Sequence, residues 1–245
     1  MNEIQVNYHF IDVNKGFEHH DKNRSTFPII YGNYLRSEPG ISGRVLDIGC
    51  GHSVNQSYKV FADRVGRLDG VDPFPAIAHP EHLASRWSCS LEDIPVSSCT
   101  YDMAYSYMVA EHIENIGPFL KKAIEIIKPG AAYWSMSPNA GHPFTWVTRI
   151  VQRLGGTSVY RKHVNALAND YPAYYNLSND AKILKAINDM RLPVSRVDFY
   201  YLPNVHWDHY FPKKLRSIAH FIDRTILLRK PKMSFILIFR IQRSS

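Results

Sequence analysis

Residues 45–53 read Val-Leu-Asp-Ile-Gly-Cys-Gly-His-Ser, an apolar run followed by two glycines on either side of a cysteine. The apolar residues predict a buried strand over residues 44–48 that ends at the glycine turn and leads into a helix. Glycine allows positive φ at such a turn, and a ligand can approach the backbone closely because no Cβ intervenes. The segment therefore predicts a strand of an α/β sheet with a ligand beside the turn that follows it.

The same turn does not fit the patterns that bind phosphate groups. Position 54 is valine where Gly-x-Gly-x-x-Gly requires glycine, and Gly-x-x-x-x-Gly-Lys-Ser/Thr does not fit either. Asp47 lies inside the strand, two residues before the turn, where a carboxylate suits a positively charged ligand or a water network beside one. A lone Gly-x-Gly also occurs in ordinary turns between a strand and a helix, so its meaning depends on the rest of the chain.

Short apolar stretches alternate with helical ones along most of the chain, which is typical of a parallel α/β sheet. A helix is predicted over residues 116–127, where apolar residues recur at helical spacing and Lys128-Pro129-Gly130 follows as a stop signal. Another helix is predicted to begin near Ser178. The apolar runs predict strands over residues 44–48, 67–71, 87–90, 101–107, 131–137, 195–202 and 233–242.

Changes in composition divide this domain into three regions. We expect residues 1–40, which mix aromatics, histidines and charges, to form an N-terminal helical cap. Residues 41–139 would form the ligand-binding core, and residues 140–245 a substrate lid with the last helix and strands of the same domain. The segments 141–177 and 199–211 are rich in aromatics, and we expect them to pack over the carboxyl edge of the sheet.

The composition excludes several classes of protein. With 45% hydrophobic and 21% charged residues, the chain has enough apolar material for a core and is not a disordered or collagen-like protein. Its three cysteines include no Cys-x-x-Cys pair, which argues against both a disulfide framework and a zinc site. The longest apolar run, residues 235–239, is far shorter than the roughly 20 residues of a membrane-spanning helix. No signal-peptide pattern opens the sequence, so we expect a cytoplasmic protein.

Positive charge is concentrated towards the C-terminus. Residues 181–245 contain 13 Lys and Arg against 4 Asp and Glu, whereas residues 1–180 contain 16 against 18. Residues 213–232 combine basic side chains with an apolar stripe at helical spacing, formed by Leu215, Ile218, Ile222 and Ile226. Such a helix can make peripheral contact with an anionic membrane, or its stripe can pack on the sheet while its charges are simply solvated. Both alternatives remain open.

Two further polar segments follow the next strands. Gly70-Val71-Asp72-Pro73 places a carboxylate at the end of the second strand, where it can accept both hydroxyls of a ribose. Residues 90–95, Ser-Leu-Glu-Asp-Ile-Pro, follow the third strand and offer polar groups to the edge of an adenine. Asp72 is thus suited to a ribose and Asp47 to a positive charge, and the sequence has no phosphate-binding pattern beside them. This combination indicates S-adenosylmethionine as the ligand.

In their order and spacing, these segments resemble the motifs of class I S-adenosylmethionine-dependent methyltransferases. The likeness is greatest to the small-molecule branch that includes ubiquinone- and menaquinone-type enzymes, and it spans roughly residues 41–139. It implies a Rossmann-like, seven-stranded, mostly parallel sheet with helices on both faces and a C-terminal aromatic-rich lid. The matching segments are residues 45–51, 70–72, 90–95, 101–103, 108–113 and 127–131.

The resemblance also implies roles for individual residues. Asp47, Gly49 and Gly51 would hold the methionine part of the cofactor, and Asp72 the ribose hydroxyls. The Leu91 backbone and Glu92 would frame the adenine, and Tyr107 and Met108 would lie near the transferred methyl group. Two positions depart from the family pattern: Ser90 stands where many relatives have Asp, and His52-Ser53 follows the glycines where relatives often have another small residue.

Methyl transfer asks little acid–base chemistry of the protein, because the sulfonium is already activated and alignment supplies most of the rate. A base is needed only where the acceptor must lose a proton, as a hydroxyl must. His112 is the nearest candidate base, although the Glu-His pair at 111–112 recurs in the family and its role can also be structural. The lid offers His142, His163, His206 and His209; the last two, with Asp208, make a weak pattern for a metal, and we expect none.

The sequence thus predicts a methyltransferase that acts on a small molecule, with oxygen as the acceptor on the strength of the resemblance. Methylation at nitrogen or carbon of a metabolite or lipid-like substrate remains open, as does a membrane- or nucleic-acid-binding module on the same scaffold. Nucleobase methylation is disfavoured because Ser137-Pro138-Asn139, which resembles the motif of such enzymes, follows the fifth strand instead of the fourth. The sequence leaves the oligomeric state and the substrate's identity open.

Overall fold

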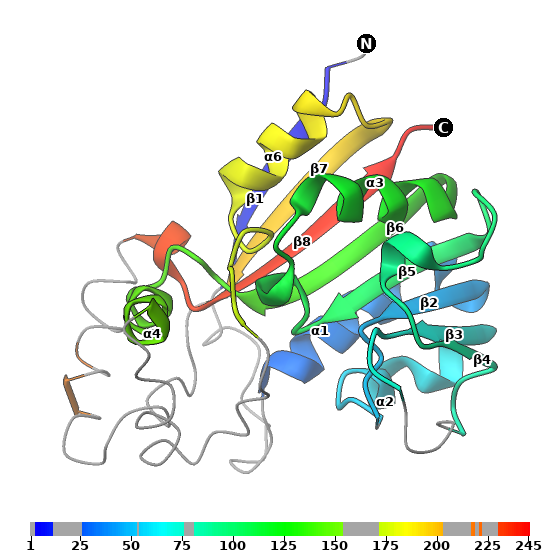
Figure 1. Ribbon diagram of the computed structural model, residues 1–245, viewed down its shortest axis with the longest axis horizontal. Coiled ribbons are helices and arrows are strands. Elements are labelled where there is room, and N and C mark those ends of the chain that lie inside the picture. The colour runs from blue at the N-terminus through cyan, green and yellow to red at the C-terminus, as the bar shows by residue number, and fades with distance from the viewer. Residues whose placement is uncertain are drawn as a thin grey trace.

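The computed structural model describes residues 3–11, 26–52, 54–75, 81–153, 172–202, 217–218, 221 and 230–245. Eight strands in these residues form one sheet, in the order β1-β7-β8-β6-β5-β2-β3-β4 (Figure 1). They are β1 (Gln5–Phe10), β2 (Arg44–Ile48), β3 (Arg67–Val71), β4 (Ser85–Trp87), β5 (Tyr101–Tyr107), β6 (Ile127–Pro138), β7 (Val194–Leu202) and β8 (Ile236–Arg243). Of these strands, only β8 runs antiparallel to its neighbours, β6 and β7. The expected mostly parallel α/β sheet is confirmed, with eight strands in place of seven.

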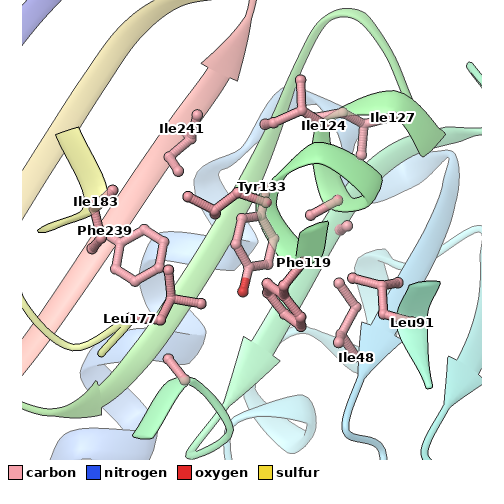
Figure 2. Packing of buried hydrophobic residues seen from close by; sticks show 14 of the residues in the cluster. Ile48, Leu91, Phe119, Ile124, Ile127, Tyr133, Leu177, Ile183, Phe239 and Ile241 are labelled. Atoms are coloured by element: carbon pink, nitrogen blue, oxygen red, sulfur yellow. The ribbon is translucent and has the colours of Figure 1, made fainter. Parts of the chain in front are cut away.

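Helices cover both faces of the sheet, with α3 and α6 on one face and α1 and α2 on the other (Figure 1). Tyr133 and Trp134 are consecutive in β6 and therefore point to opposite faces. Tyr133 belongs to the core under α3 and α6 (Figure 2), and Trp134 to the core under α1. The helices are α1 (Thr26–Ser37), α2 (Tyr58–Phe61), α3 (Ile116–Ile126), α4 (Pro143–Arg153) and α6 (Asp180–Asp189). None of the helices in the described ranges is long and apolar enough to cross a membrane.

The order of the strands creates a point of reversal beside β2. From β2 the chain moves outward to β3 and β4, and it then returns to the other side of β2 as β5. In parallel α/β sheets, ligands bind outside the carboxyl ends of the strands at such a reversal. The loops that follow β2 and β5 are therefore the ones expected to face a ligand.

The two helices predicted most directly are both present. Phe119, Leu120, Ala123 and Ile124 of α3 are buried, as their helical spacing requires. Asn179 caps α6 by accepting a hydrogen bond from the backbone N–H of Lys182, so this helix begins two residues after Ser178.

Three strands have a boundary that differs from the prediction by more than one residue. β6 begins at Ile127 instead of 131, because Ile127 pairs with Tyr101 before an irregularity in the ladder. β4 spans Ser85–Trp87 instead of 87–90, because the segment after it turns into the short 3₁₀ helix η3 (Leu91–Asp93). β8 begins at Ile236 instead of 233, because another 3₁₀ turn, η8 (Pro231–Met233), precedes it.

The expected helical cap over residues 1–40 is wrong for its first part, because residues 5–10 form the edge strand β1. Its parallel pairing with β7 places three consecutive aromatic rings over three others. Tyr8, His9 and Phe10 stack on Phe199, Tyr200 and Tyr201 with ring centroids 5.5, 4.5 and 5.6 Å apart. Aromatic pairs contribute about 0.5–1.5 kcal/mol each beyond their buried area, so three in register stabilise a strand that shows little hydrophobic alternation. Helix α1 does lie within the expected cap.

Candidate functional site

The two glycines after β2 both have positive φ, and they face different surroundings. Gly49 has a φ of +74°, and a Cβ added to it would lie 2.2 Å from Cγ2 of Val109. Gly51 has a φ of +60°, and a Cβ added there would meet nothing within 4 Å. Gly49 is therefore needed for the close approach of the loop after β5, whereas Gly51 borders open space where a ligand can reach the backbone.

Asp47, in β2 just before the glycine turn, is a buried carboxyl that lacks a full complement of partners. Its residue is 1% exposed, and neither its Oδ1 nor the Tyr105 hydroxyl makes a hydrogen bond of normal geometry with any part of the described chain. Burial raises the pKa of Asp47 to about 7, with a smaller raising effect from Asp72, while the nearby Tyr105 hydroxyl lowers it. A cation or a hydrogen-bond donor placed here would satisfy the carboxyl and favour its ionised form.

Asp72, at the end of β3, is held in place by backbone groups. Its Oδ2 accepts a hydrogen bond of 2.9 Å from the N–H of Gly51, and its Oδ1 accepts one of 2.9 Å from the N–H of Phe74. A carboxylate has about four lone-pair positions, so two remain for a ligand. Asp72 thus joins the two turns and presents a fixed acceptor pair beside Gly51.

The loop after β4 carries the residues expected to meet an adenine. The Leu91 side chain is buried in the core, so only its backbone can reach a ligand, and Glu92 beside it is exposed. The Ser90 hydroxyl donates a 2.7 Å hydrogen bond to the Asp93 carboxylate. The serine that replaces the family's usual Asp is therefore engaged in shaping η3.

The chain turns sharply after β5. Tyr107 ends the strand half-buried, with its ring centroid 6.2 Å from that of Tyr31. The next residue, Met108, has a φ of +57°, a left-handed conformation that is strained for a residue with a side chain. The sequence analysis placed Met108 beside Tyr107 near the transferred methyl group, but no residue type signalled the left-handed turn. This turn brings Val109 over Gly49 and starts the 3₁₀ helix η4 (Ala110–His112).

His112, the candidate base, makes a hydrogen bond to the lid side of the site. Its Nδ1 lies 2.9 Å from the carbonyl oxygen of Pro172, and because a carbonyl only accepts, Nδ1 carries the proton. Its Nε2 lies 4.0 Å from Oε1 of Glu111, which is beyond hydrogen-bond length. The imidazole therefore ties residue 172 to η4.

Glu111 was named in the sequence analysis only as the neighbour of His112, and not as a candidate base. It is 5% exposed, and its Oε2 has no hydrogen-bond partner in the described residues. Burial raises the pKa of its carboxyl to about 8. The Glu-His pair was visible in the sequence, but nothing in the sequence indicated which member would be buried.

The lid is only partly within the described residues. His142 is fully buried with its ring centroid 5.1 Å from that of Phe235, and burial lowers its pKa to about 3, so it is a neutral core residue. His163, His206, Asp208 and His209 lie outside the described residues, as does most of the basic segment 213–232. In the part of the chain that the structure describes, no three His, Cys, Asp or Glu side chains gather to hold a metal ion.

Comparisons with known proteins identify the family and agree with the fold. A family model described as "Methyltransferase domain" matches residues 21–182. A SAM-dependent methyltransferase from Archaeoglobus fulgidus superposes with a TM-score of 0.57 at 12% identity, covering 89% of this chain and 93% of that one. A complex of the Haloferax volcanii Trm112 methyltransferase activator with a methyltransferase gives 0.56 at 16% identity, covering 89% and 90%. A geranyl diphosphate methyltransferase in complex with SAM gives 0.54 at 15% identity, covering 89% and 84%. No curated protein matches the sequence, and at these identities the solved structures show the fold alone.

Proposed function

The chain belongs to the methyltransferase-domain family and is an S-adenosylmethionine-dependent methyltransferase, and from this premise we propose that it methylates a small molecule at an oxygen atom. One observation carries the cofactor part of the proposal. The buried, unsatisfied carboxyl of Asp47 lies just before a glycine turn that borders open space at Gly51. A buried carboxyl in need of a cation fits the ammonium group of the methionine part of the cofactor, so the residues present suit this ligand.

The other residues of the edge have complementary roles in this proposal. Asp72 would accept the ribose hydroxyls with the lone pairs that Gly51 and Phe74 leave free. The Leu91 backbone and Glu92 would frame the adenine, and Tyr107 would exclude water beside the reacting group. When bound, S-adenosylmethionine supplies an activated methyl group on a sulfonium, so the chief task of these side chains is alignment.

The acceptor's chemistry is less constrained than the cofactor's. Oxygen is favoured by the resemblance to the small-molecule branch and by the presence of a second buried carboxyl, Glu111, at the end of β5, since a hydroxyl acceptor requires a base. Carbon methylation of a lipid-like substrate is the second candidate, because a geranyl diphosphate methyltransferase is among the structural relatives.

Asn139 provides an argument against nucleobase methylation. Its Nδ2 donates to the carbonyls of Lys232 and Ser234 at 2.9 and 2.8 Å, and its Oδ1 accepts from the N–H of Gly141 at 2.9 Å. The amide therefore binds backbone on both sides, and it has no free edge with which to read a base. Its role is to join the end of β6 to the segment that precedes β8.

Two measurements test the proposal. Calorimetric titration with S-adenosylhomocysteine should show saturable binding to the wild-type chain, and its absence would refute the assignment of the cofactor site. A small-molecule extract of the source cells, incubated with the enzyme and [methyl-³H]S-adenosylmethionine, should then yield a labelled product. Hot hydriodic acid releases methyl iodide from an O-methyl group and leaves a C-methyl group in place, so volatile tritium would establish oxygen and retained tritium would establish carbon.

A further inference from the structure

Glu111 lies beside the proposed cofactor site. We call the turns after β2 and β3 (residues 47–51 and 70–74) the cofactor side of the carboxyl edge. We call η4, residues 172–176 that contact it, and α4 that contacts those residues the acceptor side. Glu111 belongs to η4, which directly follows the left-handed turn at Met108 at the carboxyl end of β5. Val109, two residues earlier, packs over Gly49 so closely that no side chain would fit there. The turn that carries Glu111 is therefore in contact with the glycine turn of the cofactor site.

The backbone on either side of this carboxyl is fixed. The carbonyl oxygen of Glu111 accepts hydrogen bonds from the N–H groups of Tyr174 and Tyr175, at 2.7 and 2.9 Å. The Arg149 guanidinium of α4 in turn donates a 2.6 Å hydrogen bond to the carbonyl of Tyr174 and lies 5.5 Å from the centre of the Tyr175 ring. These contacts fix the backbone that carries the Glu111 side chain before any substrate arrives.

In the described residues, Oε2 of Glu111 has no hydrogen-bond partner, and the ionisable group that comes within 4.0 Å of its carboxyl is His112. His112, on the same turn, uses Nδ1 to bind the Pro172 carbonyl, and its Nε2 is 4.0 Å away. Arg149 is directed to the Tyr174 carbonyl and the Tyr175 ring, and Glu114, further along the loop, is exposed. A buried carboxyl oxygen with neither a cation nor a donor is costly for the folded state, which argues that a ligand completes it.

We propose that Glu111 is the catalytic base that takes the proton of the acceptor hydroxyl, and that His112 is a positioning residue. This inference rests on the proposed function and refines it, because it assigns the substrate a hydroxyl group directed at Oε2 of Glu111. The O–H bond breaks and its proton moves to Oε2. The oxygen's electron pair forms the new bond to the methyl carbon, and the pair of the breaking C–S bond stays on sulfur.

The charge balance of this step suits a buried site. A carboxylate and a sulfonium are present before transfer, and a neutral carboxylic acid and a neutral thioether after it. Removal of two opposite charges is favoured where water is excluded, because separated charges are poorly solvated there. The raised pKa of Glu111, about 8, also makes its carboxylate a stronger proton acceptor than an exposed one. The proton then returns to water when the product leaves.

The assignment is tested by measuring methyl transfer by four variants. The methyl donor is [methyl-³H]S-adenosylmethionine, and the small-molecule extract described above supplies the acceptor. Glu111→Gln should lower the rate at least a hundredfold, and Glu111→Asp should retain part of it, while binding of S-adenosylhomocysteine changes less than threefold. Glu114→Gln is the matched control, an exposed carboxyl on the same loop, and should behave like the wild type. The wild-type rate should increase with pH as Glu111 loses its proton. His112→Gln should lower the rate less than tenfold and keep this increase with pH.

A second measurement is independent of the substrate. The unfolded chain loses the Glu111 proton near pH 4, whereas the native state keeps it to about pH 8, so wild-type stability should fall with rising pH across this interval. For Glu111→Gln, the free energy of unfolding measured in urea should lack this decrease between pH 4 and pH 8. The same measurement checks that the variant folds. A folded Glu111→Gln enzyme with more than a third of the wild-type rate would overturn the proposal. A wild-type enzyme that binds cofactor but labels nothing would instead refute the small-molecule function.

Discussion

The cofactor side and the acceptor side of the carboxyl edge are held together by contacts of different range. On the cofactor side, the Gly51 N–H reaches the Asp72 carboxylate across 21 residues, and the groups involved lie at the ends of neighbouring strands. On the acceptor side, His112 reaches Pro172 across 60 residues and Asn176 reaches the Glu114 carbonyl across 62. A cofactor common to the whole family can be bound by a compact local unit, whereas the acceptor site is built from separate parts of the chain.

The two sides nevertheless contain the same unusual feature. Each has one buried carboxyl with an unsatisfied oxygen, Asp47 on β2 and Glu111 on η4. Burial raises both pKa values, to about 7 and about 8 respectively. On the cofactor side we assign the carboxyl to a fixed positive charge, and on the acceptor side to a proton. The predictions below separate these roles, beginning with the contact that joins the two sides.

Gly49 and Gly51 should respond differently to alanine, because only Gly49 touches the acceptor side. Gly49→Ala combines a left-handed φ with a Cβ 2.2 Å from Val109, and should lower the free energy of unfolding by about 3 kcal/mol. Gly51→Ala has the strained φ but open space, and should cost about 1 kcal/mol of stability while weakening S-adenosylhomocysteine binding. Urea unfolding measures both, and equal destabilisation would mean that the two sides are not in contact at Gly49.

Asp72→Ala should weaken S-adenosylhomocysteine binding by about tenfold to a hundredfold, because it removes two charge-assisted hydrogen bonds to the ribose. It should weaken 5′-methylthioadenosine equally, since that ligand keeps the ribose and lacks the amino-acid part. Asp189→Ala is the control, because this exposed carboxylate on α6 pairs with Lys185 on the same helix. Calorimetric titration of both ligands decides it, and unchanged affinities would mean that the ribose is bound elsewhere.

The difference in sequence separation between these contacts also explains which features could be predicted from the sequence. The first and last residues of β2, β3 and β5 were predicted correctly. Each of these strands is a short stretch whose end is marked by nearby residues in the sequence, such as Gly49 after β2 and Asp72 after β3. The edge strand β1 was missed because its stabilising rings lie on β7, about 190 residues away. The burial of Glu111 was not foreseen for a similar reason, since the groups that bind its backbone carbonyl come from residues 174 and 175, more than 60 residues away. Local patterns predicted the fold and the residues that we propose bind the cofactor, whereas the arrangement of η4 and residues 172–176 depends on long-range packing.

The protonation of Asp47 should make cofactor affinity depend on pH. The free protein holds the Asp47 proton up to about pH 7, and a bound ammonium favours the ionised form, so binding must expel that proton below pH 7. Affinity for S-adenosylhomocysteine should therefore fall about tenfold between pH 8 and pH 6. Asp47→Asn should bind weakly with little change over this range, and 5′-methylthioadenosine should be insensitive to the substitution. A wild-type affinity independent of pH would contradict the assignment of Asp47 to the ammonium.

The same substitution should affect stability in the opposite direction. Because its folded-state pKa is raised, Asp47 costs the native protein stability as pH increases from about 4 to about 7. Asp47→Asn removes that cost and should raise the free energy of unfolding at pH 8 by about 1–3 kcal/mol. Urea titration at pH 5 and pH 8 measures the difference. A gain in stability at pH 8 joined to a loss of affinity would show a residue retained for binding at the expense of the fold.

The smallest expected effect concerns the outer surface of the acceptor side. Trp146, Val147 and Ile150 of α4 are 49%, 48% and 56% exposed, and Ile218 and Phe221, within the basic segment 213–232, are 56% and 63% exposed. The end of this segment is joined to the loop between β6 and α4, since the Lys232 carbonyl accepts a hydrogen bond from the Asn139 side chain. Exposed apolar groups near many basic residues favour contact with an anionic membrane, at about 1 kcal/mol for each cation near the surface.

We therefore expect weak flotation with vesicles that contain phosphatidylglycerol, lost at 0.5 M salt and absent with phosphatidylcholine alone. Trp146→Ser should lower the bound fraction about fivefold, because an indole at the interface contributes of order 1 kcal/mol. Phe10→Ser is the control, an aromatic exposed to the same degree but on β1. Equal binding to neutral and anionic vesicles would remove the electrostatic argument. It would leave the charges of residues 213–232 as solvated surface and would favour a water-soluble acceptor over a lipid-borne one.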